Sequence, residues 1–473
     1  MHKPKAEDAV TPLHDLSAVD LLAGYRSKQF SPSEVLDDVL AQIEKWEPHI
    51  KALYAFDPDG ARAAAEASTE RWQSGTPSAA LDGVPVTIKE NIATKGVPVP
   101  LGAASNKLVP ATVDAPPAAR LREAGAVIYS KTTMPDYGML SSGLSSFHPL
   151  TRNPWDLSKN PGGSSAGAGA AAAAGYGPLH LGTDIGGSVR LPACWCGLVA
   201  LKPSLGRVPI DPPYVGRVAG PITRNVDDAA LMMAVLSKPD RRDGMSLPAH
   251  DINWKALEKS PRKLRLGLML DLGVGQKLEK EVRDVVITAA KAFESAGAVV
   301  TEVDSVLTRD MLDGLDNFWR ARMWDELSKL EPAEQKKTLP YIYKWAERGA
   351  KLAGVDVVRG FNATMAIRAA AAKLFSDIDY VISPVSPVVN FPAEYASPLN
   401  DPDKPFEHIC YTVPWNMSEN PALSINGGFD QHGFPIGVQI VGRRFDDLGV
   451  LGMGKAFEGL RGEQKPWPEP PKK

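Results

Sequence analysis

The amino-acid sequence predicts an α/β fold, in which a large mixed β-sheet is covered by α-helices on both faces. Short apolar segments typical of strands alternate along the chain with longer segments whose apolar residues recur at helical spacing. The chain has 473 residues, which is long enough to bury such a sheet, and no internal repeat of fixed period occurs in it. This length allows one large domain or two of medium size.

The first clear element is a helix marked by its opening residues. Ser31-Pro32-Ser33-Glu34 combines an N-cap serine, a proline at N1 and an acid at N3, and apolar residues at helical spacing follow. Further helices are predicted over residues 116–123, 279–296, 365–375 and 448–460. Strands are predicted over residues 84–88, 126–129, 264–270, 299–303, 380–383, 422–425 and 438–441. Segments 238–262 and 396–406 are expected to be surface connections, and the C-terminal EQKPWPEPPKK is expected to be a frayed tail.

Composition and charge argue against several functions. A net charge of -3 and a pI near 6.3 provide no basic surface for nucleic acid. The N-terminus lacks an apolar leader, and no uninterrupted apolar stretch is long enough to span a membrane, so we expect a cytoplasmic protein. Cys194, Cys196 and Cys410 are too few for a disulfide framework and lack the second pair of a zinc site, so we expect buried thiols. We expect no metal and no cofactor.

The tract from Pro161 to Cys196 is the most informative part of the chain. It consists mainly of Gly, Ala and Ser, and it contains two serine turns, Gly163-Ser164-Ser165 and Gly187-Ser188. Small residues let backbone approach backbone or ligand closely, and they leave serine hydroxyls and main-chain N–H groups as the main polar groups. This combination predicts an acyl-transfer site.

Two other motifs fit parts of this tract. Gly163-Ser164-Ser165-Ala166-Gly167 matches G-x-S-x-G, the nucleophile elbow of α/β-hydrolases, and would make Ser165 the nucleophile. That elbow requires a strand directly before it, whereas loop-forming residues precede this one. Residues 167–172 also match a loose dinucleotide fingerprint, again without the preceding strand or the later acidic residue.

A third interpretation combines both serine turns with Lys89. This lysine closes the predicted strand, on the face opposite Val86 and Ile88. A serine hydroxyl is a weak nucleophile until a base removes its proton, and no histidine motif is placed to do so. Lysine can act only as the neutral amine, so burial under the Gly/Ala tract, away from carboxylates, must lower its pKa from about 10.4 to near neutrality.

On these residues the chain resembles the amidase signature family. PGGSSAGAGAAAAAG followed by LGTDIGGSVRLPACWCG covers nearly the whole signature, and VTIKEN is similar to the family's lysine motif. The similarity extends over roughly residues 60–430 and the strand after them, but not over residues 305–360. The resemblance implies a single domain of the amidase-signature fold over residues 1–470. Its parts would be N-terminal helices in 1–60, the signature core with the catalytic residues in 61–230, a variable helical or lid region in 231–375 and the C-terminal part of the sheet in 376–460.

The resemblance further implies a Ser-cisSer-Lys triad. Ser188 would be the nucleophile that carries the acyl-enzyme, and Ser164 the bridging serine that follows a cis peptide bond and relays the proton. Lys89 would be the base.

The turn around the nucleophile is expected to form an oxyanion hole. Consecutive backbone N–H groups of Ile185, Gly186, Gly187 and Ser188 can converge on a carbonyl oxygen as it becomes negative. The flanking polar residues are expected to support this geometry: Ser165 by hydrogen bonding to Ser164, and Thr183, Asp184 and Arg190 by orienting the loop.

The substrate pocket is predicted from two regions. Met134, Tyr137 and Gly138 lie where family members often carry a loop that borders the substrate, and Tyr137 is the expected wall residue. Trp319 belongs to an aromatic-rich region that suggests a lid or pocket for an aryl or apolar substrate, although amphipathic helices packed on the core would explain these aromatic residues equally well.

Two function classes follow. The first is a stand-alone hydrolase of a small aryl or apolar amide or carbamate, similar to aryl acylamidases and urethanases. It would act as a monomer or homodimer and would bind neither nucleic acid nor membrane. A hydrolase of the same family that prefers esters is a variant of this class. The second is the catalytic subunit of a tRNA-linked glutamine amidotransferase. Such subunits usually carry a tyrosine-rich helix before the SP-x-x-P strand, and here that helix reads MAIRAAAAKLFSDID, which favours the first class.

Overall fold

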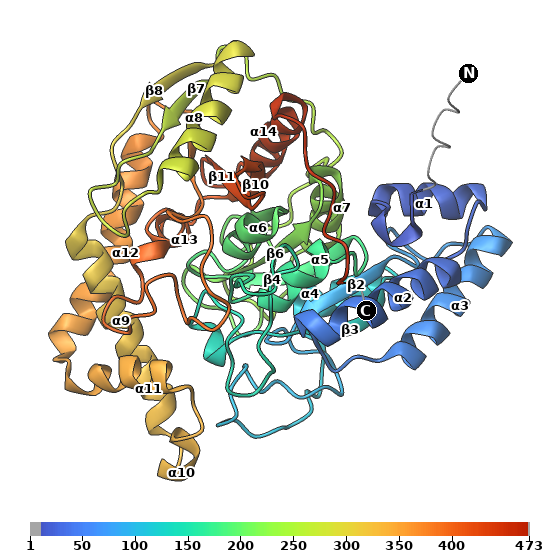
Figure 1. Cartoon of the computed structure of the whole chain (residues 1–473), viewed down its shortest axis with the longest axis horizontal. Coiled ribbons are helices and arrows are strands. Elements are labelled where there is room, and N and C mark those ends of the chain that lie inside the picture. Colours follow the sequence, from blue (N-terminus) through green and yellow to red (C-terminus); the bar gives the residue numbers. More distant parts are fainter. Residues whose placement is uncertain (1–10, 472–473) are drawn as a thin grey trace.

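The structure is a computed structural model, and it describes residues 11–471. Its centre is a mixed sheet of 11 strands in the order β1-β3-β2-β4-β6-β5-β10-β11-β9-β7-β8 (Figure 1). The strands are β1 (Leu53–Tyr54), β2 (Pro85–Lys89), β3 (Val127–Thr132), β4 (Leu179–Asp184), β5 (Val199–Lys202), β6 (Val218–Thr223), β7 (Arg265–Leu268), β8 (Val299–Glu302), β9 (Tyr380–Pro384), β10 (Ala422–Phe429) and β11 (Pro435–Gly442). β2 is parallel to β3 and β4, β7 is parallel to β8 and β9, and the other neighbours are antiparallel. The predicted α/β class is confirmed.

Helices cover both faces of the sheet. They are α1 (Ala18–Ser27), α2 (Pro32–Ile50), α3 (Pro58–Ser74), α4 (Pro116–Glu123), α5 (Ala166–Ala173), α6 (Arg190–Cys196), α7 (Val226–Leu236), α8 (Lys280–Ser295), α9 (Arg309–Ser328), α10 (Pro332–Gln335), α11 (Pro340–Ala346), α12 (Gly354–Leu374), α13 (Val413–Met417) and α14 (Asp447–Leu460). Short 3-10 helices are η1 (Leu13–Asp15), η2 (Asp136–Gly138), η3 (Glu347–Lys351) and η4 (Glu407–Ile409). No helix within residues 11–471 is long and apolar enough to cross a membrane.

Alternation along the strands separates two buried layers. Val86 and Ile88 of β2 belong to the core cluster shared with α1, α4, α7, α8 and α14. Smaller clusters on the opposite face pack the sheet against α2, α3, α5, α6, α12 and α13. Lys89 points to this second face, as the alternation predicts, and all five residues of β2 are buried. Helix α9 packs against α12, and α11 packs against α9, at one side of the molecule (Figure 1, yellow to orange).

The Gly/Ala composition of α5 allows close packing. All eight residues of α5 are buried. A Cβ on Gly167 would lie 2.2 Å from the Ala52 carbonyl oxygen and 2.5 Å from the Thr133 backbone nitrogen, so only glycine fits there. The low complexity of this segment therefore permits the helix to lie directly against the backbone where β1 begins and β3 ends.

Several predicted elements need correction. The helix marked by Ser31 begins with the predicted capping box, but β4, β5, β6, α3, α5 and α6 were not predicted. Helices α1, α9 and α11 lie in regions expected to be helical, but no bounds were predicted for them. A fully buried helix such as α5 is apolar on all sides and therefore lacks the periodicity that marks a surface helix. The predicted helix 365–375 is the end of α12, which already starts at Gly354.

Two segments expected at the surface are partly buried. In segment 396–406, Ala396 is 0% exposed and Phe406 is 6% exposed. The C-terminal segment is not frayed at Trp467, because this side chain packs against Trp155 and its ring lies 4.3 Å from the Arg224 guanidinium carbon. Residues 472–473 of the predicted tail lie outside the described residues. Pro, Asp and Ser indicate irregular backbone but say little about burial. The three cysteines are free and buried, as predicted.

Candidate active site

Lys89 and the two serine turns meet at one edge of the sheet. β2 and β4 are parallel neighbours in which Ile88 pairs with Leu181, so Lys89 lies beside the last residues of β4. The carboxyl ends of parallel strands face the same edge. The first serine turn leads into α5 and the second connects β4 to α6, and both helices cover the face to which Lys89 points.

Lys89 is a buried amine held by hydroxyl groups. Its side chain is 0% exposed, and Nζ donates to Ser164 Oγ at 2.8 Å and to Thr183 Oγ1 at 3.0 Å. Burial lowers the pKa of Lys89 to about 7, although the carboxylates of Asp184 and Glu90 oppose this shift. The sequence-based expectation that Lys89 would lie away from carboxylates was therefore wrong. Removing the charged amine from water costs more free energy than its attraction to the two carboxylates returns, so the pKa still falls.

Ser164 and Ser188 line the same cavity. The peptide bond between Gly163 and Ser164 is cis, as the resemblance implied. The Ser188 side chain is 9% exposed, and within residues 11–471 no hydrogen bond joins its hydroxyl to Ser164 or to another side chain. The hydrogen bond between Lys89 and Ser164 is therefore formed here, whereas the one expected between Ser164 and Ser188 is not. Hydrogen bonds of this kind often tighten only when substrate binds.

Asp184 organises the turn that carries Ser188. Its carboxylate accepts hydrogen bonds from the N–H groups of Gly187, at 2.8 Å, and Val189, at 3.1 Å. Arg190 donates to both carboxylate oxygens, at 3.0 and 3.1 Å. Burial alone would raise the pKa of Asp184, but the Arg190 guanidinium holds this pKa well below its usual range. The carboxylate thus stays ionised and fixes the turn.

The oxyanion-hole prediction needs one correction. The Gly187 N–H donates to Asp184, so it is not free to bind a substrate oxygen. Within residues 11–471 no acceptor occupies the N–H groups of Ile185, Gly186 and Ser188, and these three remain candidate donors. Gly187 has φ of 129°, a conformation that favours glycine, so its role is to let the turn form.

Ser165 also differs from its prediction. It does not bond the Ser164 side chain but donates from Oγ to the Thr183 carbonyl oxygen at 3.2 Å, and its N–H donates to the Ser188 carbonyl oxygen at 3.1 Å. The residue starts α5 and faces β4, so it ties the two serine turns together. No strand precedes it, which agrees with rejecting the nucleophile elbow.

Two cavities open on either side of Ser188. Both are lined by Gly138, Met139, Ile185, Trp319 and Ser188. The wide cavity, of about 380 Å³, also reaches Ser164 and includes the predicted Met134 and Tyr137. The narrow cavity, of about 40 Å³, lies on the other side. All four predicted pocket residues therefore line a cavity that contains the candidate nucleophile.

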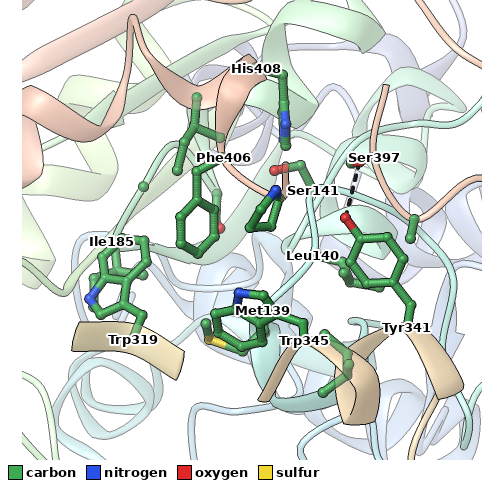
Figure 2. A pocket seen from close by; sticks show the side chains of 17 residues that line it. Met139, Leu140, Ser141, Ile185, Trp319, Tyr341, Trp345, Ser397, Phe406 and His408 are labelled. Atoms are coloured by element: carbon green, nitrogen blue, oxygen red, sulfur yellow. Dashed lines mark hydrogen bonds between the residues drawn. The ribbon is translucent and has the colours of Figure 1, made fainter. Parts of the chain in front are cut away.

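Aromatic rings shape the narrow cavity. Figure 2 shows Trp319, Tyr341, Trp345 and Phe406 around a common space, with the His408 ring pointing into it. His408 is 3% exposed, and burial lowers its pKa to about 3, so its ring is neutral. Within residues 11–471 its Nε2 has no hydrogen-bond partner. The cavity thus offers mainly apolar walls, with neutral hydroxyl groups and the unpartnered nitrogen of a neutral histidine as its polar groups.

Sequence reasoning missed several residues at this site. Asn91 donates to Thr183 Oγ1 at 3.0 Å, and its place two positions after Lys89 in VTIKEN was a usable signal. His408, Arg217 and Arg322 also line the cavities, but no local motif marks them. Tertiary packing alone brings them to Ser188.

Comparisons with known proteins agree with this geometry. Residues 34–451 match the Amidase family, so the chain belongs to that family and is an amidohydrolase. It is 33% identical to an acylamidase of Rhodococcus erythropolis, with 96% of each chain covered. It is 32% identical to a glutamyl-tRNA(Gln) amidotransferase subunit of Chloroflexus aurantiacus, covering 95% of this chain and 98% of the relative. The crystal structure of a bacterial aryl acylamidase of the amidase signature enzymes superposes with a TM-score of 0.87 at 29% identity, covering 95% of this chain and 97% of that one.

Proposed function

We propose that the protein hydrolyses small aryl or apolar amides, and carbamates of similar shape, through an acyl-enzyme on Ser188. One observation carries the proposal: the buried Lys89 amine, with its pKa lowered to about 7, lies 2.8 Å from Ser164 Oγ in a cavity that Ser188 also lines. A neutral lysine in this position can act as the base that a serine nucleophile needs.

The chemistry follows from the positions of these groups. Neutral Lys89 accepts the Ser164 proton while Ser164 accepts the Ser188 proton, and Ser188 Oγ attacks the carbonyl carbon. The N–H groups of Ile185, Gly186 and Ser188 bind the oxygen as it becomes negative. The proton then returns through Ser164 to the leaving nitrogen, the C–N bond breaks and the amine departs. Water attacks the acyl-enzyme by the same proton route and releases the acid.

The cavities support the substrate class. The narrow cavity, of about 40 Å³, fits only a small apolar group, because aromatic side chains form its walls and its polar groups are neutral. The wide cavity leaves room for a larger group on the other side of the scissile bond. An aryl amide or N-aryl carbamate satisfies both requirements.

A glutaminase activity is the second candidate. The 32% identity to the amidotransferase relative favours it about as strongly as the 33% identity to an acylamidase favours the first. Within α12 there is no tyrosine, unlike the tyrosine-rich helix usual in such amidotransferases, and this supports the stand-alone hydrolase.

A substrate panel separates the two. The kcat/KM values of anilides, primary aryl and aliphatic amides, N-aryl carbamates, simple esters and L-glutamine are compared, with Ser188→Ala as the control. We expect an anilide or N-aryl carbamate to exceed its aliphatic counterpart by about tenfold or more. L-glutamine as the best substrate would contradict the proposal, and so would turnover of anilides by Ser188→Ala at the wild-type rate.

A further inference from the structure

Two arginines line the wide cavity without forming a salt bridge. Arg217 lies just before β6 and Arg322 lies on α9, so they come from distant parts of the sequence to the cavity that contains Ser164 and Ser188. Within residues 11–471, neither guanidinium lies within salt-bridge distance of a carboxylate. Other largely buried arginines do form such pairs, namely Arg190, Arg207, Arg224 and Arg320. Besides burial, the positive charge of Arg217 also lowers the pKa of Lys89, but neither guanidinium takes part in the proposed bond-making and bond-breaking steps.

Both guanidinium groups are held in place by uncharged partners. Arg217 donates from Nη2 to the Pro212 carbonyl oxygen, and its buried Nε has no hydrogen-bond partner within the described part of the chain. Arg322 stacks over the Tyr214 ring, with its guanidinium carbon 3.9 Å from the ring centroid. Each arginine is therefore positioned but keeps N–H groups available for a ligand.

The charge of Arg217 is poorly compensated. Burial lowers the pKa of Arg217 to about 10, and the positive charge of Arg322 acts in the same direction, against Asp211 and Asp243. Asp243 is already occupied, because it accepts hydrogen bonds from the backbone N–H groups of Ile210 and Met245. A partly buried cation beside a like charge is unfavourable unless an anion joins it.

The carboxylates at this cavity do not compensate the charge of Arg217. Asp211 and Glu326 also line it, but both side chains are exposed to solvent and neither bonds an arginine of the cavity. An anion between the two guanidinium groups would remove their mutual repulsion and occupy the free N–H groups. A carboxylate suits this position because guanidinium and carboxylate are planar and pair through two hydrogen bonds.

We propose that the wide cavity binds a substrate carboxylate between Arg217 and Arg322, so that the preferred substrates are aryl amides or carbamates that carry a carboxylate on the wide-cavity side of the scissile bond. This inference rests on the proposed function, because Ser188 supplies the chemistry. It narrows the substrate class from apolar amides to amides with one apolar and one anionic end.

Matched substrate pairs test the inference. N-phenylsuccinamate carries its carboxylate on the acyl side of the scissile bond, and 4-acetamidobenzoate carries it on the amine side. Each is compared with the neutral compound in which a carboxamide replaces the carboxylate. We expect a higher kcat/KM for the carboxylate in the pair whose carboxylate reaches the wide cavity, by about 30-fold or more over its carboxamide and mainly through a lower KM. In Arg217→Gln and in Arg322→Gln this ratio should fall to near one, whereas Arg359→Gln, on an exposed part of α12, should retain it.

A binding measurement keeps the test independent of turnover. In Ser188→Ala, calorimetry should show the preferred carboxylate binding more tightly than its carboxamide, and adding Arg217→Gln should abolish the difference. Equal binding of carboxylate and carboxamide to Ser188→Ala would overturn the inference, as would a preference that survives both arginine substitutions. Carboxylate-selective binding without any turnover by the wild-type protein would instead contradict the proposed function.

Discussion

Burial determines the chemistry available to Lys89. Two carboxylates act to keep this amine protonated, yet its removal from water is the larger effect and brings the pKa down to about 7. Thr183 and Ser164 contact the amine through hydroxyl oxygens, so its partners carry no charge. At the scale of one residue, this environment leaves much of the amine neutral near pH 7, as the proposed role of Lys89 as the base requires.

The pH profile should report this base. The pKa of Lys89 is lowered from 10.5 to about 7, so the amine is protonated and inactive below pH 7 and neutral and active above it. We expect kcat/KM to rise with pH through an apparent pKa near 7 and to level off above it, as measured with an uncharged substrate.

Two substitutions provide the controls for this profile. Lys89→Met should reduce kcat/KM by at least about 100-fold, the usual contribution of a general base. Lys202→Met should retain the acid limb, because burial also lowers the pKa of Lys202 to about 7 but this residue lines neither cavity. An acid limb that persists unchanged in Lys89→Met would exclude this lysine as the base.

At the scale of elements, α5 positions the first serine turn. The helix lies against backbone atoms of Ala52 and Thr133, and Ser165 at its start bonds the second serine turn. A small shift of α5 therefore moves Ser164 relative to Lys89 and Ser188.

Adding one methyl group to α5 should show this dependence. In Gly167→Ala the new Cβ would lie 2.2 Å from the Ala52 carbonyl oxygen, so we expect a loss of about 1–3 kcal/mol in the free energy of unfolding and a lower kcat. Gly459→Ala on α14 is the matched control, because a Cβ there meets nothing within 4 Å. Urea denaturation should show no loss for the control, and an equally stable Gly167→Ala would refute the packing argument.

The elements also show what the sequence could predict. Capping at Ser31 and apolar strands such as β2 carry local signals, and these were predicted correctly. Strand β4, which leads to the nucleophile turn, follows a Gly/Ala segment without alternation and was missed. The three catalytic candidates lie in local motifs and could be found, whereas His408 and Arg217 reach the cavities only through tertiary packing.

At the scale of the whole molecule, Arg224 connects both ends of the described chain to α5. It donates to the carbonyl oxygens of Ala172, at 2.9 Å, and Ala173, at 3.1 Å, at the C-terminal end of this helix. The same guanidinium pairs with Asp15 at 2.5 Å and lies over the Trp467 ring. The C-terminal segment, which runs back across the molecule after α14 (Figure 1), thus supports the helix that begins at the site.

Removing the Trp467 ring should therefore weaken the whole fold. We expect Trp467→Ala to lower the free energy of unfolding by about 1–2 kcal/mol, through loss of the contacts with Arg224 and Trp155. Val109→Ala, at a side chain that is 67% exposed, should change it by less than about 0.5 kcal/mol. Thermal and urea unfolding of both variants measure this, and equal stabilities would mean that the segment is only loosely attached.

The most direct test of the account is the position of a covalent adduct with a serine-directed fluorophosphonate. Because the account makes Ser188 the nucleophile and Lys89 its base, peptide mapping by mass spectrometry should place the adduct on Ser188. Labelling should disappear in Ser188→Ala and become much slower in Lys89→Met. An adduct on Ser165, or undiminished labelling of Ser188→Ala, would contradict the account.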